Sequence, residues 1–285
     1  MLLPTYGAIT GWAALRWQRA AWFDGVSDDG HTSRPVTLAT GGRTLRQQPG
    51  IAVSEEGLSP SELMVVDGLR VTHPLRSTSF EMRHARFDEQ AVTALDMSAY
   101  SDLVSIEEMV GHVARMLPVT GVPRCRRAVA LADENSWSPR ETRMRLLWEG
   151  MADGPRLLCN VPVFDRLGRH VATPDLLDPA AGVAGEYEGS VHLPAARRAH
   201  DVRREHELRI LGLEYVTMVG ADQADLAGLQ ARITAAYGRA RRVPDDQRAW
   251  TIQPPAWWVS TTSVAQRRAL TVAQRERLLT HRRVA

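Results

Sequence analysis

The 285-residue sequence contains no lysine, so all 35 of its basic residues are arginine. Its 33 acidic residues leave a formal net charge of only +2. A charge this small does not identify a nucleic-acid-binding protein, so any such surface must come from local patches. Arginine suits bidentate contacts to phosphate, and the absence of lysine therefore does not exclude a nucleic-acid partner.

Cysteine and long apolar stretches are also scarce. Cys125 and Cys159 are the only cysteines, and neither lies in a C-x-x-C or zinc-type pattern. This predicts reduced, buried thiols. The sequence has no apolar run long enough to cross a bilayer, and its N-terminus lacks the pattern of a signal peptide. We therefore expect an intracellular, cytoplasmic protein without a membrane partner.

The first half of the chain predicts short strands followed by helices. After a helix over 11–17, apolar runs separated by Gly and Pro turns, Asp67-Gly68 among them, predict strands over 35–40, 51–53 and 63–66. Helices are expected from 77, over 87–100, from 105, where Ser105 and Glu108 form a capping box, and from 121. The last carries an arginine cluster that is either a solvated helix face or an edge that contacts phosphate, namely Arg124, Arg126 and Arg127.

The second half predicts a mixed sheet with helices on its faces. Ser138 caps a helix over 139–150, and Glu141 at its third position is expected to accept the Ser138 N–H in a capping box. The expected elements that follow are strands over 157–163, 171–176 and 182–188, a helix over 195–211, a strand over 213–219 and a helix over 222–242. Together with the first half, this predicts an α/β (α+β) protein.

The end of the chain combines tryptophans with arginines and predicts two short helices, the second capped by Thr271 and Gln274. The tryptophans either dock on the core, with the arginines in solvent, or bind single strands. The residues concerned are Trp250, Trp257, Trp258, Arg267, Arg268, Arg275, Arg277, Arg282 and Arg283.

Three carboxylates form the candidate site. Glu186 and Glu188 are two residues apart, so on a strand they project from the same face. If Asp175 ends a neighbouring strand, the three side chains converge. Clustered carboxylates raise one another's pKa unless a cation lies among them, and oxygen ligands of this kind suit Mg²⁺ or Mn²⁺.

This ordered set resembles the PD-(D/E)XK nuclease superfamily, and most closely its Vsr-like branch, the DUF559 group. In actinobacterial proteins that group is fused to a domain related to AbiEi-type antitoxins. The resemblance covers about 138–219 and rests on the helix that carries Glu141, on Pro174-Asp175, on Glu186-Tyr187-Glu188 with His192, and on a helix with Asp201 and Arg204. It implies three regions: an AbiEi-related α/β and helical domain without an evident winged helix over 1–132, a nuclease core over 133–243 and a basic tail over 244–285.

The resemblance also implies the metal ligands. Asp175, Glu186 and the backbone carbonyl of Tyr187 would bind Mg²⁺ or Mn²⁺, with Glu141 and Glu188 as further candidates. Glu188 stands where many relatives carry lysine. A carboxylate there cannot stabilise the phosphate as lysine does, but it can orient a metal-bound water as a base or bind a second ion.

His192 and three arginines complete the implied site. A histidine can move a proton at neutral pH, although a structural role is equally compatible with this sequence. The family pattern points Arg204 at the phosphate, where its guanidinium could hold two oxygens. Arg198 and Arg203 are further candidates for contacts to DNA.

The expected function is a metal-dependent DNA endonuclease in defence against phages and mobile elements or in DNA repair. The alternative is a catalytically inactive antitoxin-like or DNA-binding regulatory protein that keeps the nuclease fold. The expected partners are DNA and a cognate toxin or other defence-system protein. A homodimer is also compatible, because restriction-type nucleases often pair to cut both strands.

Overall fold

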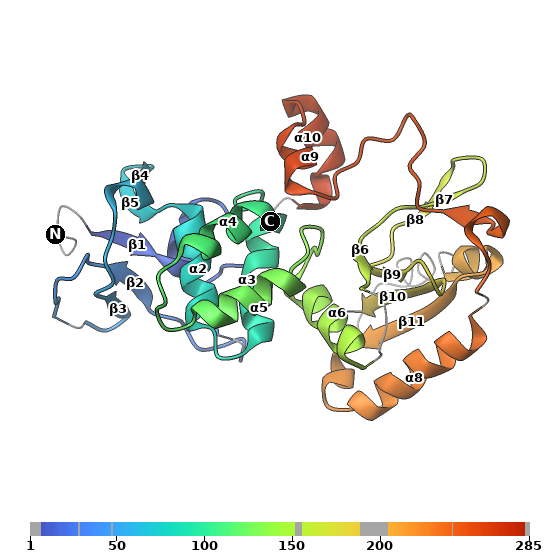
Figure 1. Ribbon diagram of the computed structural model, residues 1–285, viewed down its shortest axis with the longest axis horizontal. Coiled ribbons are helices and arrows are strands. Elements are labelled where there is room, and N and C mark those ends of the chain that lie inside the picture. The colour runs from blue at the N-terminus through green and yellow to red at the C-terminus, as the bar shows by residue number, and fades with distance from the viewer. Residues whose placement is uncertain are drawn as a thin grey trace. The chain divides into compact units, whose positions relative to one another are not determined.

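The computed structural model describes residues 7–27, 29–46, 48–151, 156–188, 205–240 and 242–282. The described chain is a mixed α/β structure with helices and three sheets, which confirms the α+β class (Figure 1). It divides into two compact units. Unit 1 comprises Met1–Glu134 and Ser263–Ala285, and unit 2 comprises Asn135–Thr262, so the predicted tail over 244–285 is shared between them. Within the described residues, no helix is both long and apolar enough to span a membrane.

Unit 1 contains a five-stranded sheet in the order β3-β2-β1-β5-β4. Its strands are β1 (Ala8–Thr10), β2 (Val36–Ala39), β3 (Ile51–Ser54), β4 (Leu63–Val66) and β5 (Leu69–Thr72). The three strands predicted here are confirmed. Asp67 and Gly68, at φ 46° and 79°, form the two-residue turn between β4 and β5, a conformation that an Asp-Gly pair favours.

The helices predicted over 11–17, over 87–100, from 105 and from 121 in unit 1 are confirmed, whereas the one predicted from 77 starts earlier, at Pro74. In chain order these helices are α1 (Gly11–Trp17), α2 (Pro74–His84), α3 (Asp88–Tyr100), α4 (Ile106–Arg115) and α5 (Val122–Leu131). The capping box of α4 is confirmed, because Ser105 Oγ accepts the Glu108 N–H at 3.1 Å and Glu108 Oε2 accepts the Ser105 N–H at 2.7 Å. In the arginine cluster, Arg124 and Arg127 form ion pairs with Asp88 on α3.

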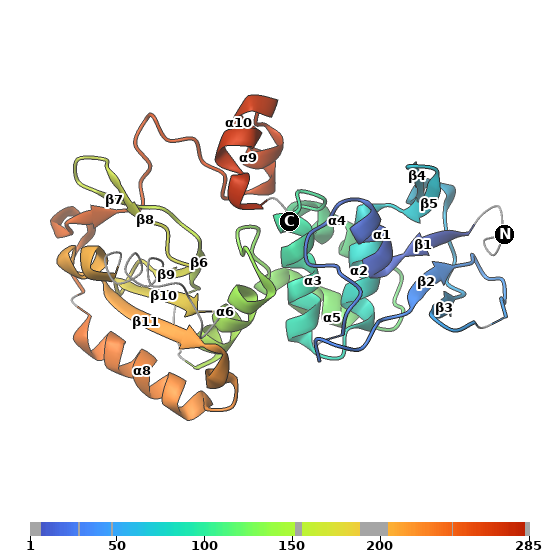
Figure 2. The same cartoon turned by 180° about the vertical axis from the view of Figure 1, so that it is seen from behind.

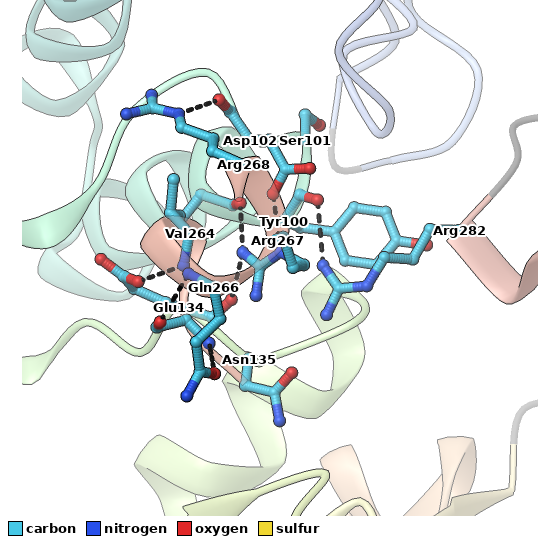
Figure 3. Close-up of polar contacts among 12 residues, drawn as sticks. Tyr100, Ser101, Asp102, Glu134, Asn135, Val264, Gln266, Arg267, Arg268 and Arg282 are labelled. Carbon is cyan, nitrogen blue, oxygen red and sulfur yellow. Dashed lines mark hydrogen bonds and ion pairs between the residues drawn. The ribbon is translucent and has the colours of Figure 1, made fainter. Parts of the chain in front are cut away.

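The two short terminal helices, α9 (Val264–Arg268) and α10 (Val272–Leu278), are attached to the C-terminal end of α3 by arginines (Figure 3). The Arg267 side chain is fully buried and donates to Asp102 Oδ1 at 2.6 Å and to the Ala99 carbonyl at 2.8 Å. The prediction that these arginines lie in solvent is therefore wrong for Arg267. Periodicity alone does not reveal a buried cation whose partners lie about 165 residues away in sequence.

Unit 2 contains two sheets rather than one. The four-stranded sheet has the order β11-β10-β9-β6, and the three-stranded sheet has the order β12-β7-β8. The strands are β6 (Leu158–Cys159), β7 (Val163–Asp165), β8 (His170–Ala172), β9 (Leu176–Asp178), β10 (Val183–Glu188), β11 (Glu214–Val219) and β12 (Trp250–Thr251). The long strands predicted over 157–163 and 171–176 are thus wrong, because each is interrupted, over 160–162 and over 173–175, by a segment that contains a proline, Pro162 or Pro174. Proline lacks the N–H that a ladder requires, so the chain passes from one sheet to the other at these points.

The four-stranded sheet of unit 2 is covered on one face by two helices, α6 (Pro139–Met151) and α8 (Leu226–Arg239) (Figure 2). A Cβ on Gly185 would lie 2.5 Å from the Trp148 ring, so the absence of a side chain lets α6 approach β10 closely. The second core brings together residues of β7, β8, β9, β10 and β12 with Leu208 of the helical stretch 205–210. The α6 prediction is confirmed, while α8 is shorter at both ends than the predicted 222–242.

Candidate active site

Asp175 and Glu186 lie opposite each other where the pairing of β9 with β10, the two central strands of the four-stranded sheet, comes to its end. The antiparallel pairing of β9 with β10 ends at Leu176 opposite Gly185, so continuing the register by one residue sets Asp175 opposite Glu186. Asp175 Oδ2 accepts the backbone N–H of Tyr187 at 2.8 Å, which ties this carboxylate to β10. Glu186 is only 9% exposed. The register thus brings together the two carboxylates that the sequence analysis paired.

Glu141 is presented to the same region by the first turn of α6. Ser138 Oγ accepts the Glu141 N–H at 3.2 Å, as the capping signal predicted. The Glu141 carboxylate reaches back one residue further than expected, because its Oε2 accepts the N–H of Trp137 at 2.8 Å rather than that of Ser138. The helix start therefore fixes the position of a carboxyl group that is 8% exposed.

The only two asparagines of the chain are Asn135 and Asn160; Asn160 bonds Glu141 directly, and Asn135 bonds Asn160. Asn160 Nδ2 donates to Glu141 Oε2 at 2.7 Å and to the Asn135 carbonyl at 2.8 Å. The Asn160 backbone N–H donates to the Asp175 carbonyl at 3.0 Å. Neither asparagine was predicted as part of the site. Asn160 has a left-handed φ of 47°, which asparagine tolerates better than most residues, but no motif marks this position.

The pKa of Glu141 is raised to about 7, first by burial and then by the negative charge of Asp175. The hydrogen bonds from Asn160 and Trp137 oppose that rise. A buried carboxyl group next to another carboxylate is more stable with its proton on, unless a cation compensates the charge. Upward pKa shifts were expected from clustered carboxylates, and here burial is the larger cause.

We expect Glu141→Gln to remove a pH dependence of stability. Because the folded pKa lies above the ordinary value of 4.5, the folded state keeps a proton that the unfolded state releases between pH 4.5 and 7. The free energy of unfolding should therefore fall as the pH rises through this window, by up to about 3 kcal/mol. The free energies of unfolding of the variant and of wild type can be measured with urea in EDTA. The value for the variant minus the value for wild type should be larger at pH 8 than at pH 5. A difference that stays constant with pH would contradict this account.

Tyr187 and Glu188, which follow Glu186, become progressively more exposed. Tyr187 lies on the helix-covered face, where its hydroxyl accepts from Arg140 Nη1 at 2.8 Å and its ring lies 5.5 Å from the same guanidinium. Glu188, the last residue of β10, is exposed. His192, Arg198, Asp201, Arg203 and Arg204 lie outside the described residues, and their predicted roles stay predictions.

The side chains around Asp175 offer the kind of donor atoms that hard cations prefer. The carboxylates of Asp175, Glu186 and Glu141 offer only oxygen, the ligand type that Mg²⁺ and Mn²⁺ prefer. Asn160 Oδ1 is a buried oxygen with no hydrogen-bond partner among the described residues. In geometry, however, the part of the chain that is described contains no group of three or more His, Cys, Asp or Glu placed to hold a metal ion. Of the predicted convergence of Asp175, Glu186 and Glu188, the register shows only that Asp175 faces Glu186, and the part of Glu188 stays a prediction.

Comparisons of the chain with protein-family models, curated proteins and solved structures gave no match in any of the three. The interpretation of the site therefore rests on its own geometry and chemistry.

Proposed function

We propose that unit 2 is a metal-dependent endonuclease of the PD-(D/E)XK type that hydrolyses phosphodiester bonds in DNA. The observation that carries the proposal is the position of Asp175 opposite Glu186 at the end of the β9–β10 pairing, with the Glu141 carboxyl within the electrostatic influence of Asp175. The helix α6, which precedes the strands of the mixed four-stranded sheet in the chain, supports the same proposal.

In this proposal Asp175, Glu186 and the Tyr187 carbonyl hold Mg²⁺ or Mn²⁺. The ion, when bound, supplies a more acidic water and neutralises charge on the phosphate. Glu188, exposed at the end of β10, accepts a proton from the attacking water. His192 returns a proton to the leaving oxygen. Arg204 holds the phosphate, and Arg198 and Arg203 contact the neighbouring backbone.

The direct test is incubation of the purified full chain with supercoiled plasmid in Mg²⁺, in Mn²⁺ and in EDTA. We expect nicked or linear product in the divalent ions and none in EDTA. Ion-independent cleavage would point to another chemistry, and the absence of cleavage in both ions would remove the proposal.

A second function fits two observations. Glu188 replaces the lysine common in such nucleases, and no group of three or more metal-ligating side chains is assembled among the described residues. These features would suit an antitoxin-like or DNA-binding regulatory protein that has kept the fold without cutting. It predicts a specific complex with a cognate protein or a promoter fragment and no ion-dependent cleavage. Gel-shift and affinity-capture experiments with the intact chain distinguish the two functions.

A further inference from the structure

Unit 2 exposes a tryptophan on a cluster of aromatic rings. Phe164 of β7, which is fully buried, contacts Trp258 edge-on with ring centroids 5.0 Å apart. His170 of β8 stacks on Trp258 at 5.1 Å with the rings inclined by 28°. Trp257 lies against Trp258 at 5.5 Å, yet its own side chain is 62% exposed. Phe164 also contacts Trp257, edge-on at 6.3 Å, so two inner rings support Trp257 while most of it stays exposed to solvent.

The neighbouring β7–β8 turn is held in a fixed shape. Asp165 Oδ1 accepts the backbone N–H groups of Leu167 and Arg169 at 3.0 and 2.9 Å. Arg166 donates to the carbonyls of Asp245 and Arg248, which join the turn to the segment before β12. The turn consequently presents Leu167, 94% exposed, and the Arg169 side chain, 77% exposed, in a defined position.

The aromatic cluster is continuous with the candidate active site. His170 Nε2 lies 2.9 Å from Thr173 Oγ1, and Thr173 is two residues before Asp175. Two residues of extended chain span at most about 7 Å. A nucleic-acid strand advances roughly 3.4 Å per nucleotide. A strand with a phosphodiester bond at Asp175 would thus reach the aromatic cluster within a few nucleotides.

We infer that Trp257 is a stacking platform for an unpaired base of the DNA, and that the exposed Arg169, whose Nε donates to Asp165 Oδ2 at 3.0 Å, contacts the backbone through its outer nitrogens. The inference rests on the proposed function and narrows its substrate to DNA with single-stranded segments. An open indole face stacks on a base only where that base is not already covered by its neighbours, as in single strands, gaps and ends. Stacking is indifferent to sequence, because every base has a flat face.

The test is the affinity of the full chain for a short fluorescein-labelled single strand, measured by anisotropy with Ca²⁺ in place of Mg²⁺. We expect Trp257→Ala to weaken binding about tenfold, in line with the loss of one stacked base, and Trp257→Phe to restore most of it. Binding to the matching blunt duplex should change little. Trp22→Ala, which removes another tryptophan that is 51% exposed, serves as the control. Equal melting temperatures establish that the variants are folded.

The inference is overturned if wild type does not bind the single strand, if Trp257→Ala and Trp22→Ala bind it equally, or if duplex binding falls as much as single-strand binding. An equal loss of duplex binding would indicate that this surface binds double-stranded DNA. Either of the other two results would indicate that the exposed Trp257 ring contacts a protein partner instead. The results also distinguish failure of this inference from failure of the proposed function. If wild type cleaves DNA in an ion-dependent way and Trp257→Ala binds the single strand as wild type does, only the stacking inference is wrong. If single-strand binding depends on Trp257 but no cleavage occurs, only the nuclease proposal is wrong.

Discussion

Glu186→Gln should lower the rate of Mg²⁺-dependent plasmid cleavage by about a thousandfold. Glutamine keeps the size of the side chain but removes the charge that attracts a divalent ion, and losing several kcal/mol of charge stabilisation corresponds to this factor. The position of Glu186 opposite Asp175, with only 9% of it exposed, makes it the more buried member of the pair. Initial rates of nicking at saturating Mg²⁺ measure the effect.

Asp246→Asn is the matched control for this prediction. Asp246 is an exposed carboxylate of the same unit and is not one of the proposed metal ligands, so its replacement removes one negative charge without changing the site. We expect wild-type cleavage from this control and an unchanged melting temperature for both variants. Cleavage by Glu186→Gln within a few-fold of wild type would show that the ion does not depend on this residue.

Arg267→Met should lower the free energy of unfolding of unit 1 by about 3 kcal/mol, because removing one partner of a buried ion pair leaves the other uncompensated. The Arg267 side chain is fully buried between Asp102, the Ala99 carbonyl and the Glu134 carbonyl (Figure 3). Among the described residues, Asp102 keeps Arg275, at 2.7 Å, as its one charged partner in the variant. Calorimetric melting should therefore show a lower temperature for the transition of this unit.

The control for Arg267→Met is Arg277→Met, which changes an exposed arginine of α10. This substitution should leave the transition within about 0.5 kcal/mol of wild type, as is usual for surface positions. Limited proteolysis should also cut Arg267→Met within 263–282 faster than it cuts the control. Equal melting and equal proteolysis of the two variants would mean that α9 and α10 are held by other contacts.

Local signals predicted much of the fold correctly. The Ser105–Glu108 and Thr271–Gln274 capping boxes mark the starts of α4 and α10, and both are present with their hydrogen bonds. Such signals work because they involve residues three apart, whose contacts do not depend on the rest of the chain. The strands of unit 2 were harder, because an apolar run does not specify which of two sheets it joins.

The candidate site was likewise predictable from the sequence only in part. Asp175 and Glu186 could be paired from the sequence, because a strand pattern and its register determine which residues face each other. The Asn135–Asn160 network around Glu141 could not, since its hydrogen bonds link residues 19 to 25 positions apart through irregular backbone. The burial of Arg267 depends on partners still further away. Only the folded chain shows where these long-range polar contacts form.

The most direct test of the account is a calorimetric titration of the full chain with Mn²⁺ at pH 8, where the Glu141 carboxyl, with a pKa of about 7, is largely ionised. We expect saturable binding by wild type and by Asp246→Asn, and a loss of that binding in Asp175→Asn. Binding that survives unchanged in Asp175→Asn, or no binding by wild type, would contradict the assignment of Asp175 and Glu186 as metal ligands.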